Sequence, residues 1–289
     1  MPPKQCRSTD GIADPLDVRV VASGNVLGRA FREGGGSWNA ANRPSKRERL
    51  ANMHWCLGIR SSGSTWVFNA VRKIALTLVP ERPILGPYIV RHADLPELAD
   101  LVPLVIAKSH ETDEAASVEL SKHAEAIWIS IRDPRDCVAS LVQHHSLDFD
   151  TALQNVKRDA RFCMRFVAHP RSCVLRYEAG FADNPATLDR IAAGFGGVLS
   201  ASDRERIFAE TRRPAIEAFI EQLDKLPTAL RPSPNDLVDP VTKWHRHHAN
   251  RTGEIGRWRR MLTPPQAAAI EQQLGDWMNS FSYAPESAI

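Results

Sequence analysis

The chain has 289 residues, of which 43% are hydrophobic and 25% are charged. These proportions are ordinary for a soluble globular protein, and the length allows one large α/β domain or two small ones. The net charge of +3 suits an anionic small ligand at least as well as nucleic acid, and no long run of Lys or Arg favours nucleic acid. We therefore expect no nucleic-acid partner.

Three further features bear on where the protein works. No apolar stretch approaches the roughly 20 residues that a membrane span needs. The N-terminus lacks the basic-then-apolar pattern of a signal peptide. The five cysteines are scattered and form no CxxC pair, which indicates reduced thiols. Together these features predict a cytoplasmic protein without a membrane span.

Residues 1 to about 50 differ in character from the rest. They are rich in Gly, Arg, Asn and Ser and show no sustained periodicity. This composition is typical of disordered segments. We expect a disordered extension over residues 1–50 and one domain over residues 51–289.

From residue 53 onward, predicted strands and helices alternate. Apolar runs predict strands over 53–59, 101–110, 126–133 and 171–178. Periodic segments predict helices over 65–79, from 134 onward, over 148–168 and over 184–197, and the last third reads as mostly helical. This order predicts an α/β fold with a central parallel β-sheet flanked by helices, in a three-layer arrangement like that of P-loop NTPases.

In such a sheet, ligands bind beyond the carboxyl ends of the strands. The first such place is Gly58–Thr65, whose spacing is that of the P-loop, G-x-x-x-x-G-K-[ST], with Ser64 in place of the lysine. Backbone N–H groups and a helix N-terminus attract a phosphate without side-chain charge, and Ser62, Ser64 and Thr65 add hydroxyl donors. A serine-rich turn with an ordinary N-cap is the alternative.

The second strand ends in the sequence Lys-Ser-His at 108–110. A histidine is the natural general base for a hydroxyl nucleophile, so His110 is a candidate for that role. Lys108 lies on the same side of an extended chain and could stabilise negative charge on an oxygen. Without further context, two solvated loop residues are the simpler interpretation.

The third strand ends at Arg132, and Ser140 follows within the next helix. An arginine can hold a phosphate through two hydrogen bonds. A P-loop kinase would instead use Asp133 as a magnesium ligand. This is disfavoured because Arg132 beside it opposes a metal and because Asp-Pro commonly starts a helix.

Late in the chain, residues 250–260 combine glycines with arginines. The glycines let the backbone approach a ligand closely and the arginines supply charge, although a basic surface loop has the same composition. Just before them, His245, His247 and His248 suggest a metal site. No acidic residue or cysteine is spaced to complete one, so we expect a helix beside the cleft there and no metal.

Five segments, taken in order over about residues 53–283, resemble the PAPS-dependent sulfotransferase family. The segment SSGSTW at 61–66 is similar to the family's 5′-phosphosulfate loop, K/R-S-G-T-T-W, and KSH is similar to its K-T-H. The segment RDPRDCVAS at 132–140 is similar to R-[DN]-P-[KR]-D-x-x-x-S, and VLRYE places Tyr177 at the end of a strand. The last, RTGEIGRW at 251–258, is similar to R-K-G-x-x-G-x-W. One such match is weak, but five in order are specific.

The resemblance implies transfer of a sulfuryl group from PAPS (3′-phosphoadenosine 5′-phosphosulfate) to a hydroxyl of a small-molecule or saccharide acceptor. It implies PAP as the product, no required metal, His110 as the general base and Lys108 near the transferred group. A homodimer is compatible with this assignment. The cofactor-binding residues that it implies are Ser61, Ser62, Gly63, Ser64, Thr65, Trp66, Arg132, Ser140, Tyr177, Arg251, Thr252 and Gly253.

The sequence departs from the family pattern at two positions. Ser61 stands where the family has Lys or Arg, with Arg60 one residue early, and Thr252 replaces a lysine. A degenerate member that binds PAP or PAPS with little activity therefore stays open as an alternative, and a P-loop kinase is a weaker one. The acceptor pocket is expected from loops near 80–95, 111–120 and 225–243, and adenine contacts are expected near 206–213.

Overall fold

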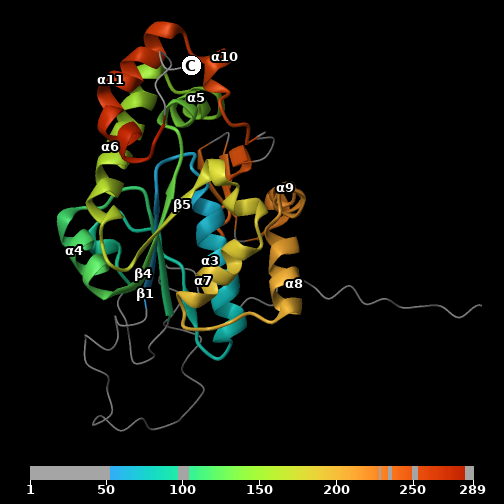
Figure 1. Ribbon diagram of the computed structural model, residues 1–289. Coiled ribbons are helices and arrows are strands. Elements are labelled where there is room, and N and C mark those ends of the chain that lie inside the picture. Colours follow the sequence, from blue (N-terminus) through green and yellow to red (C-terminus); the bar gives the residue numbers. More distant parts are fainter. Residues whose placement is uncertain (1–52, 97–103, 228, 234–235, 249–252, 284–289) are drawn as a thin grey trace, which may run out of the picture.

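The computed structural model describes residues 53–96, 104–227, 229–233, 236–248 and 253–283. The predicted extension over 1–50 and two predicted cofactor residues, Arg251 and Thr252, lie outside these ranges. Figure 1 shows a sheet in the middle of the molecule with helices on either side of it.

Five strands form the central sheet, in the order β2-β3-β1-β4-β5, and all of them are parallel. Because they are parallel, their carboxyl ends meet at one edge, which is where a ligand site is expected. The predicted α/β fold with a parallel sheet is confirmed. The strands are β1 (Met53–Gly58), β2 (Ile84–Leu85), β3 (Leu104–Ser109), β4 (Ala124–Ile131) and β5 (Ser172–Arg176).

The helices cover the two faces of this sheet, so the predicted three layers are present (Figure 1). Trp55 and Leu57 of β1 pack into a core with α4, α5, α6 and α11, whereas Cys56 faces a second core with α3, α7 and α8. Alternate residues of a strand point to opposite faces, and here both faces are buried. The helices are α3 (Ser64–Leu78), α4 (Glu114–His123), α5 (Pro134–His145), α6 (Phe149–Val167), α7 (Ala186–Ala193), α8 (Ala201–Thr211), α9 (Arg213–Ile220), α10 (Trp258–Met261) and α11 (Pro264–Ser280).

Local chemistry sets the starts of the helices that carry site residues. At α5 the Asp133 carboxylate accepts a hydrogen bond of 2.9 Å from the Arg135 backbone N–H, and Pro134 occupies the first turn. At α6 the Asp148 carboxylate accepts one of 2.9 Å from the Thr151 N–H. Each cap satisfies an N–H group that the helix itself leaves unpaired.

Four elements differ from the sequence prediction, and one of them is the two-residue strand β2, which lies in a segment predicted as a loop. Helix α4 begins at Glu114, after the Asp113 cap, so the expectation of a loop over 111–120 is wrong for residues 114–120. The last third is helical as predicted apart from an antiparallel pair, β6 (Leu230–Ser233) and β7 (Asp236–Val238). Short strands and a helix with a mostly polar surface give weak periodic signals, which is why they were missed.

In the part of the chain that the structure describes, the connections include short 3-10 helices at His92–Asp94, Tyr177–Ala179, Phe181–Asp183, Leu223–Lys225 and Arg246–His248. Within the described ranges, no helix combines the length and the apolar character that crossing a bilayer requires. Of the cysteines in those ranges, Cys56, Cys137, Cys163 and Cys173 are free thiols, as predicted.

Candidate active site

A cavity of about 740 Å³ lies at the carboxyl edge of the sheet. Its basic lining residues come from the ends of β1, β3 and β4 and from two later segments, and among the described residues the one acidic residue in the lining is Asp236. This imbalance favours an anionic ligand. The basic residues are Arg60, Lys108, Arg132, Lys243 and Arg257.

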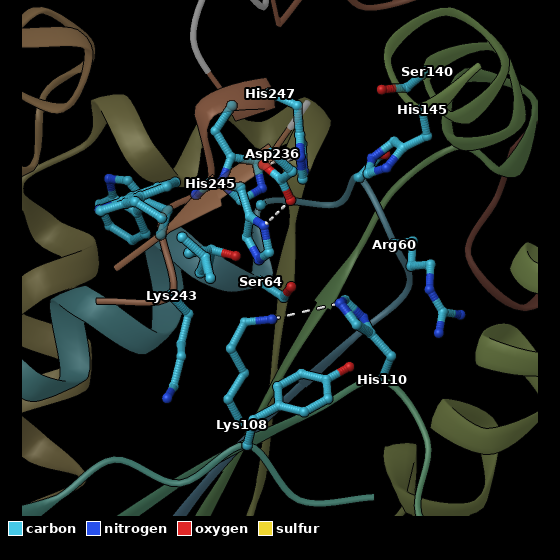
Figure 2. A pocket seen from close by; sticks show the side chains of 18 of the residues that line it. Arg60, Ser64, Lys108, His110, Ser140, His145, Asp236, Lys243, His245 and His247 are labelled. Carbon is cyan, nitrogen blue, oxygen red and sulfur yellow. Dashed lines mark hydrogen bonds and ion pairs between the residues drawn. The ribbon is translucent and has the colours of Figure 1, made fainter. Parts of the chain in front are cut away.

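Two sides of this cavity have different characters. We call one side the arginine wall: the loop residues Ser61 and 63–66, together with Arg132, Ser140, Tyr177, Gly253 and Arg257. We call the other the histidine wall: Leu230, Asp236, Val238, Pro240, Lys243, Trp244, His245, His247 and His248. Figure 2 shows members of both around Lys108 and His110.

The turn between β1 and α3 presents the start of a helix to the cavity. Gly63 has a positive φ of 85° and caps α3, which begins at Ser64. The N–H groups of the first helical turn have no partner inside the helix, so those that follow Gly63 are available to an anion. Ser61, Gly63, Ser64 and Thr65 all line the cavity as expected.

Ser62 has a different place from the other loop residues and is not among those that line the cavity. Its N–H donates to the Ile59 carbonyl over 3.1 Å, and its hydroxyl is 2.7 Å from both that carbonyl and the Ser130 hydroxyl. These bonds hold the turn against β4. The expected N–H and hydroxyl donors of Ser62 are therefore committed to the protein itself.

Lys108 and His110 both line the cavity, where the end of β3 places them on the same side. The Lys108 Nζ is 3.5 Å from the His110 Nε2 and 5.3 Å from the centre of the Tyr88 ring. Burial lowers the pKa of Lys108 to about 8, so the ammonium form still predominates at pH 7.

The hydrogen bonds of His110 identify its neutral tautomer. Its Nδ1 is 2.6 Å from the Gly58 carbonyl oxygen, which can only accept, so Nδ1 carries the proton. The Nε2 lone pair is then directed to Lys108. Burial, with the nearby charges of Lys108 and Arg60, holds the pKa of His110 well below its usual range. The imidazole is thus a neutral proton acceptor at physiological pH.

Arg60 does not replace the basic residue that the loop lacks at position 61. Its guanidinium forms a close ion pair with the fully buried Asp159 of α6, and its N–H donates to the same carboxylate over 3.0 Å. Burial raises the pKa of Asp159 to about 7. Arg60 contributes charge to the edge of the cavity, but Lys108 is the cation that lies against His110.

Arg132 is held by the backbone at the end of β4. It donates to the Ser61 carbonyl over 3.1 Å and to the Glu254 carbonyl over 2.7 Å, and its guanidinium lies 4.2 Å from the Tyr177 ring centre. The Tyr177 hydroxyl donates to the Gly253 carbonyl over 3.2 Å. Segments that are far apart in the chain, at 61, 132, 177 and 253, are therefore brought together.

Arg257 was not among the predicted site residues, although its motif was recognised. Arg132 and Arg257 are each only 5% exposed, and both line the cavity. Among the described residues, the Nε of each is buried without a hydrogen-bond partner. Burial and the charge of Arg132 lower the pKa of Arg257. Two buried cations with unused donors form a site that fits an anion.

Two aspartates of the α5 start have structural partners. The fully buried Asp136 accepts hydrogen bonds from the N–H groups of Gly256 (2.7 Å) and Trp258 (3.0 Å), which anchors the glycine-rich segment. The Asp133 carboxylate is bound by the Arg135 side chain at 3.0 and 2.7 Å. This pairing argues against Asp133 as a magnesium ligand.

Trp66 lies at the edge of the cavity and is mostly buried. Its Nε1 donates to the Thr211 carbonyl over 2.8 Å, and its ring packs near Phe181. The predicted adenine segment, 206–213, therefore contacts the arginine wall through Thr211. Of the predicted acceptor segments, 80–95 supplies Tyr88 and 225–243 supplies five lining residues, whereas 111–120 supplies none.

The histidine wall contains an acidic partner that the sequence argument missed. Asp236 lies nine positions before His245, and its carboxylate oxygens are 2.6 Å from the His245 Nδ1 and 3.3 Å from the His247 Nδ1. Asp236 begins β7, and the bridge between Val238 of that strand and His245 brings them together. The expectation that no acidic residue could join these histidines is wrong.

Comparisons with known proteins find relatives by structure and not by sequence. No family model matches the chain, and no curated protein matches it. Retinol dehydratase in complex with retinol and PAP is similar with a TM-score of 0.54 at 15% identity, over 82% of this chain and 83% of that chain. The same enzyme with androsterone and the inactive cofactor PAP gives 0.52 at 15% identity, over 82% of both chains.

A mouse sulfotransferase, SULT7A1, complexed with PAP, is similar with a TM-score of 0.53 at 14% identity, over 79% of this chain and 85% of that chain. At identities this low, the structural similarity establishes the fold alone. The resemblance that the five motifs predicted is confirmed at that level: the chain has the fold of the sulfotransferases.

Proposed function

We propose that this protein is a PAPS-dependent sulfotransferase that acts on a hydroxyl of a small-molecule or saccharide acceptor. The observation that carries the proposal is the arginine wall beside the Lys108–His110 pair. A helix start, two buried arginines and a neutral histidine line one cavity of a fold whose solved examples contain PAP. These are the groups that a phosphorylated donor and a hydroxyl acceptor require.

The residues fit a ligand with two separate phosphate groups. The N–H groups that follow Gly63, with the hydroxyls of Ser64 and Thr65, would hold the 5′-phosphate. Arg132, Ser140, Arg257 and the Gly253 backbone would hold the 3′-phosphate, and Trp66 would border the adenine. We extend the same assignment to Arg251 and Thr252, which lie outside the described residues.

When bound, PAPS supplies the sulfuryl group. His110 lines the cavity, and its unprotonated Nε2 takes the proton of the acceptor hydroxyl as it attacks. Lys108 Nζ, 3.5 Å from that nitrogen, stabilises the negative charge that develops on oxygen atoms during the transfer. An anion in the cavity raises the pKa of His110 from its lowered value and so strengthens it as a base.

A degenerate PAP-binding protein is the second candidate, and one observation favours it. Position 61 carries serine, and the ion pair with Asp159 holds Arg60 away from that role. In this case PAP binds but transfer is slow. A P-loop kinase is disfavoured because Arg135 occupies Asp133 and because Ser64 replaces the phosphate-binding lysine.

Calorimetric titration tests the proposal. We expect PAP without magnesium to bind more tightly than ATP with magnesium, and labelled PAPS to donate its sulfuryl group in an acceptor screen. PAP binding without transfer to any acceptor would favour the degenerate protein. Preference for ATP with magnesium would overturn the proposal.

A further inference from the structure

The histidine wall contains a group of side chains that sulfuryl transfer by His110 and Lys108 does not use. Asp236 is the first residue of β7, His245 is bridged to β7 through Val238, and His247 lies in the 3-10 helix that follows. One ligand atom from each of the three lies within 4.8 Å of the others. Figure 2 shows the three side chains gathered on one side of the pocket, with Lys108 and His110 below them.

We propose that Asp236, His245 and His247 bind a divalent transition-metal ion of the zinc class. Two imidazoles and one carboxylate form a ligand set that suits such ions. Magnesium and calcium bind mainly oxygen ligands, so this set suits them less well. Ligand atoms around a tetrahedral zinc are about 3.3 Å apart at its usual bond lengths. The ligand atoms now lie within 4.8 Å of one another, so zinc binding needs adjustments of up to about 1.5 Å in their separations.

The position of the group is suited to an ion that exchanges with solvent. The exposed fractions of the side chains are 31% for His245, 21% for His247 and 19% for Asp236, so an ion can enter from the cavity. Three protein ligands leave at least one coordination position open, as in catalytic zinc sites. That position faces the cavity, because all three residues line it.

The surroundings support these ligands. The His145 ring lies 4.3 Å from that of His247, and the His248 ring lies 4.6 Å from it. The His248 Nδ1 accepts the His245 backbone N–H over 3.0 Å, which holds the segment in place. The main competing role for the same contacts is a hydrogen-bonded Asp–His pair that only fixes the loop.

Metal titration of the full chain, prepared without a histidine tag and stripped with a chelator, separates the two roles. We expect Co²⁺ to bind with a stoichiometry of one and to give the visible absorption of a low-symmetry nitrogen and oxygen site. Zn²⁺ should displace it. Asp236→Asn, which keeps a hydrogen-bond acceptor but removes the charge, and His247→Gln should each weaken Zn²⁺ by at least about 10- to 100-fold.

His92→Gln is the matched control, because His92 is exposed and is not among the residues that line the cavity. It should bind Co²⁺ like the unchanged protein. An absence of the Co²⁺ spectrum, or a spectrum that survives both Asp236→Asn and His247→Gln, would overturn the metal site. PAP calorimetry on the same samples reports separately on the proposed sulfotransferase function and on whether each variant is folded.

Discussion

The two walls of the cavity are built in different ways. Arg132 on the arginine wall is buried, and two backbone carbonyls and an aromatic ring fix its position. The side chains of Asp236, His245 and His247 on the histidine wall are partly exposed, and the rings of His245 and His247 lie 4.7 Å apart. The histidine wall is joined to the sheet layers by contacts such as the hydrogen bond of 2.7 Å from the Asn69 amide to the Thr242 carbonyl.

This difference separates what the fold determines from what this chain adds. Ser61, Arg132 and Tyr177 of the arginine wall follow strands β1, β4 and β5, whose positions are set by the packed core, so we expect an anion to bind at this place in the fold. The histidine wall comes from residues 230–248, a segment outside the central sheet. We expect donor binding to depend on the first wall, and the choice of acceptor or metal to depend on the second.

The largest expected effect lies between the walls, at His110. Replacing it with Gln removes the proton acceptor but keeps a polar side chain of similar reach, so turnover should fall about 10²- to 10⁴-fold. PAP affinity should change little, because His110 is assigned to the acceptor. Turnover numbers with labelled PAPS and calorimetry with PAP measure the two quantities. An unchanged turnover would move the general base to the histidine wall.

The sequence was informative where the site is local in the chain. The segments around Lys108, Arg132 and Tyr177 each place a side chain at the end of a strand, and strand positions could be predicted from apolar runs. Ser62 shows the limit of this reasoning: its hydroxyl lies in the right motif, but it is turned toward Ser130 of a neighbouring strand. Such a pairing depends on strand order, which no local pattern contains.

Asp236 was missed for a related reason. Its partnership with His245 and His247 depends on β7 and on the bridge between Val238 and His245, and so short a strand gave no periodic signal. Residues three or four positions apart are neighbours on a helix, but Asp236 lies nine positions before His245 and reaches it only across a turn. The motif around Arg257 was recognised, but its burial beside Arg132 could be seen only in three dimensions.

A smaller effect tests the division between the walls directly. Arg132→Ala should weaken PAP by about 10- to 100-fold, because a hydrogen-bonded charge pair with a phosphate is lost. His247→Gln on the opposite wall should change PAP affinity by about twofold or less, the range of substitutions outside a binding contact. Calorimetry measures both, and Arg165→Ala on the exposed side of α6 is the control. Equal losses in the two variants would show that the donor spans both walls.

The smallest expected effect concerns a histidine buried near the amino end of β1, which contrasts with the partly exposed histidines on the histidine wall. His54 of β1 stacks 3.8 Å from the Phe195 ring and accepts the Trp128 Nε1–H over 3.3 Å. Burial lowers its pKa from 6.5 to about 3. The unfolded chain therefore binds a proton below pH 6.5 that the folded chain excludes, and the free energy of unfolding falls as the pH falls from about 6.5 toward 3.

Between pH 7.5 and 5.5 this linkage should cost the unchanged protein about 1.4 kcal/mol. His54→Gln keeps an acceptor for Trp128 but cannot titrate, so its loss over the same range should be smaller by that amount. Urea unfolding at the two pH values measures this loss in each protein. Other groups such as Asp159 titrate in both proteins, so their contribution cancels when the two losses are subtracted. Equal pH dependence in the two proteins would mean that His54 is protonated in the folded state. In that case the carboxylate of Glu125, 3.8 Å from its Nε2, would offset the burial.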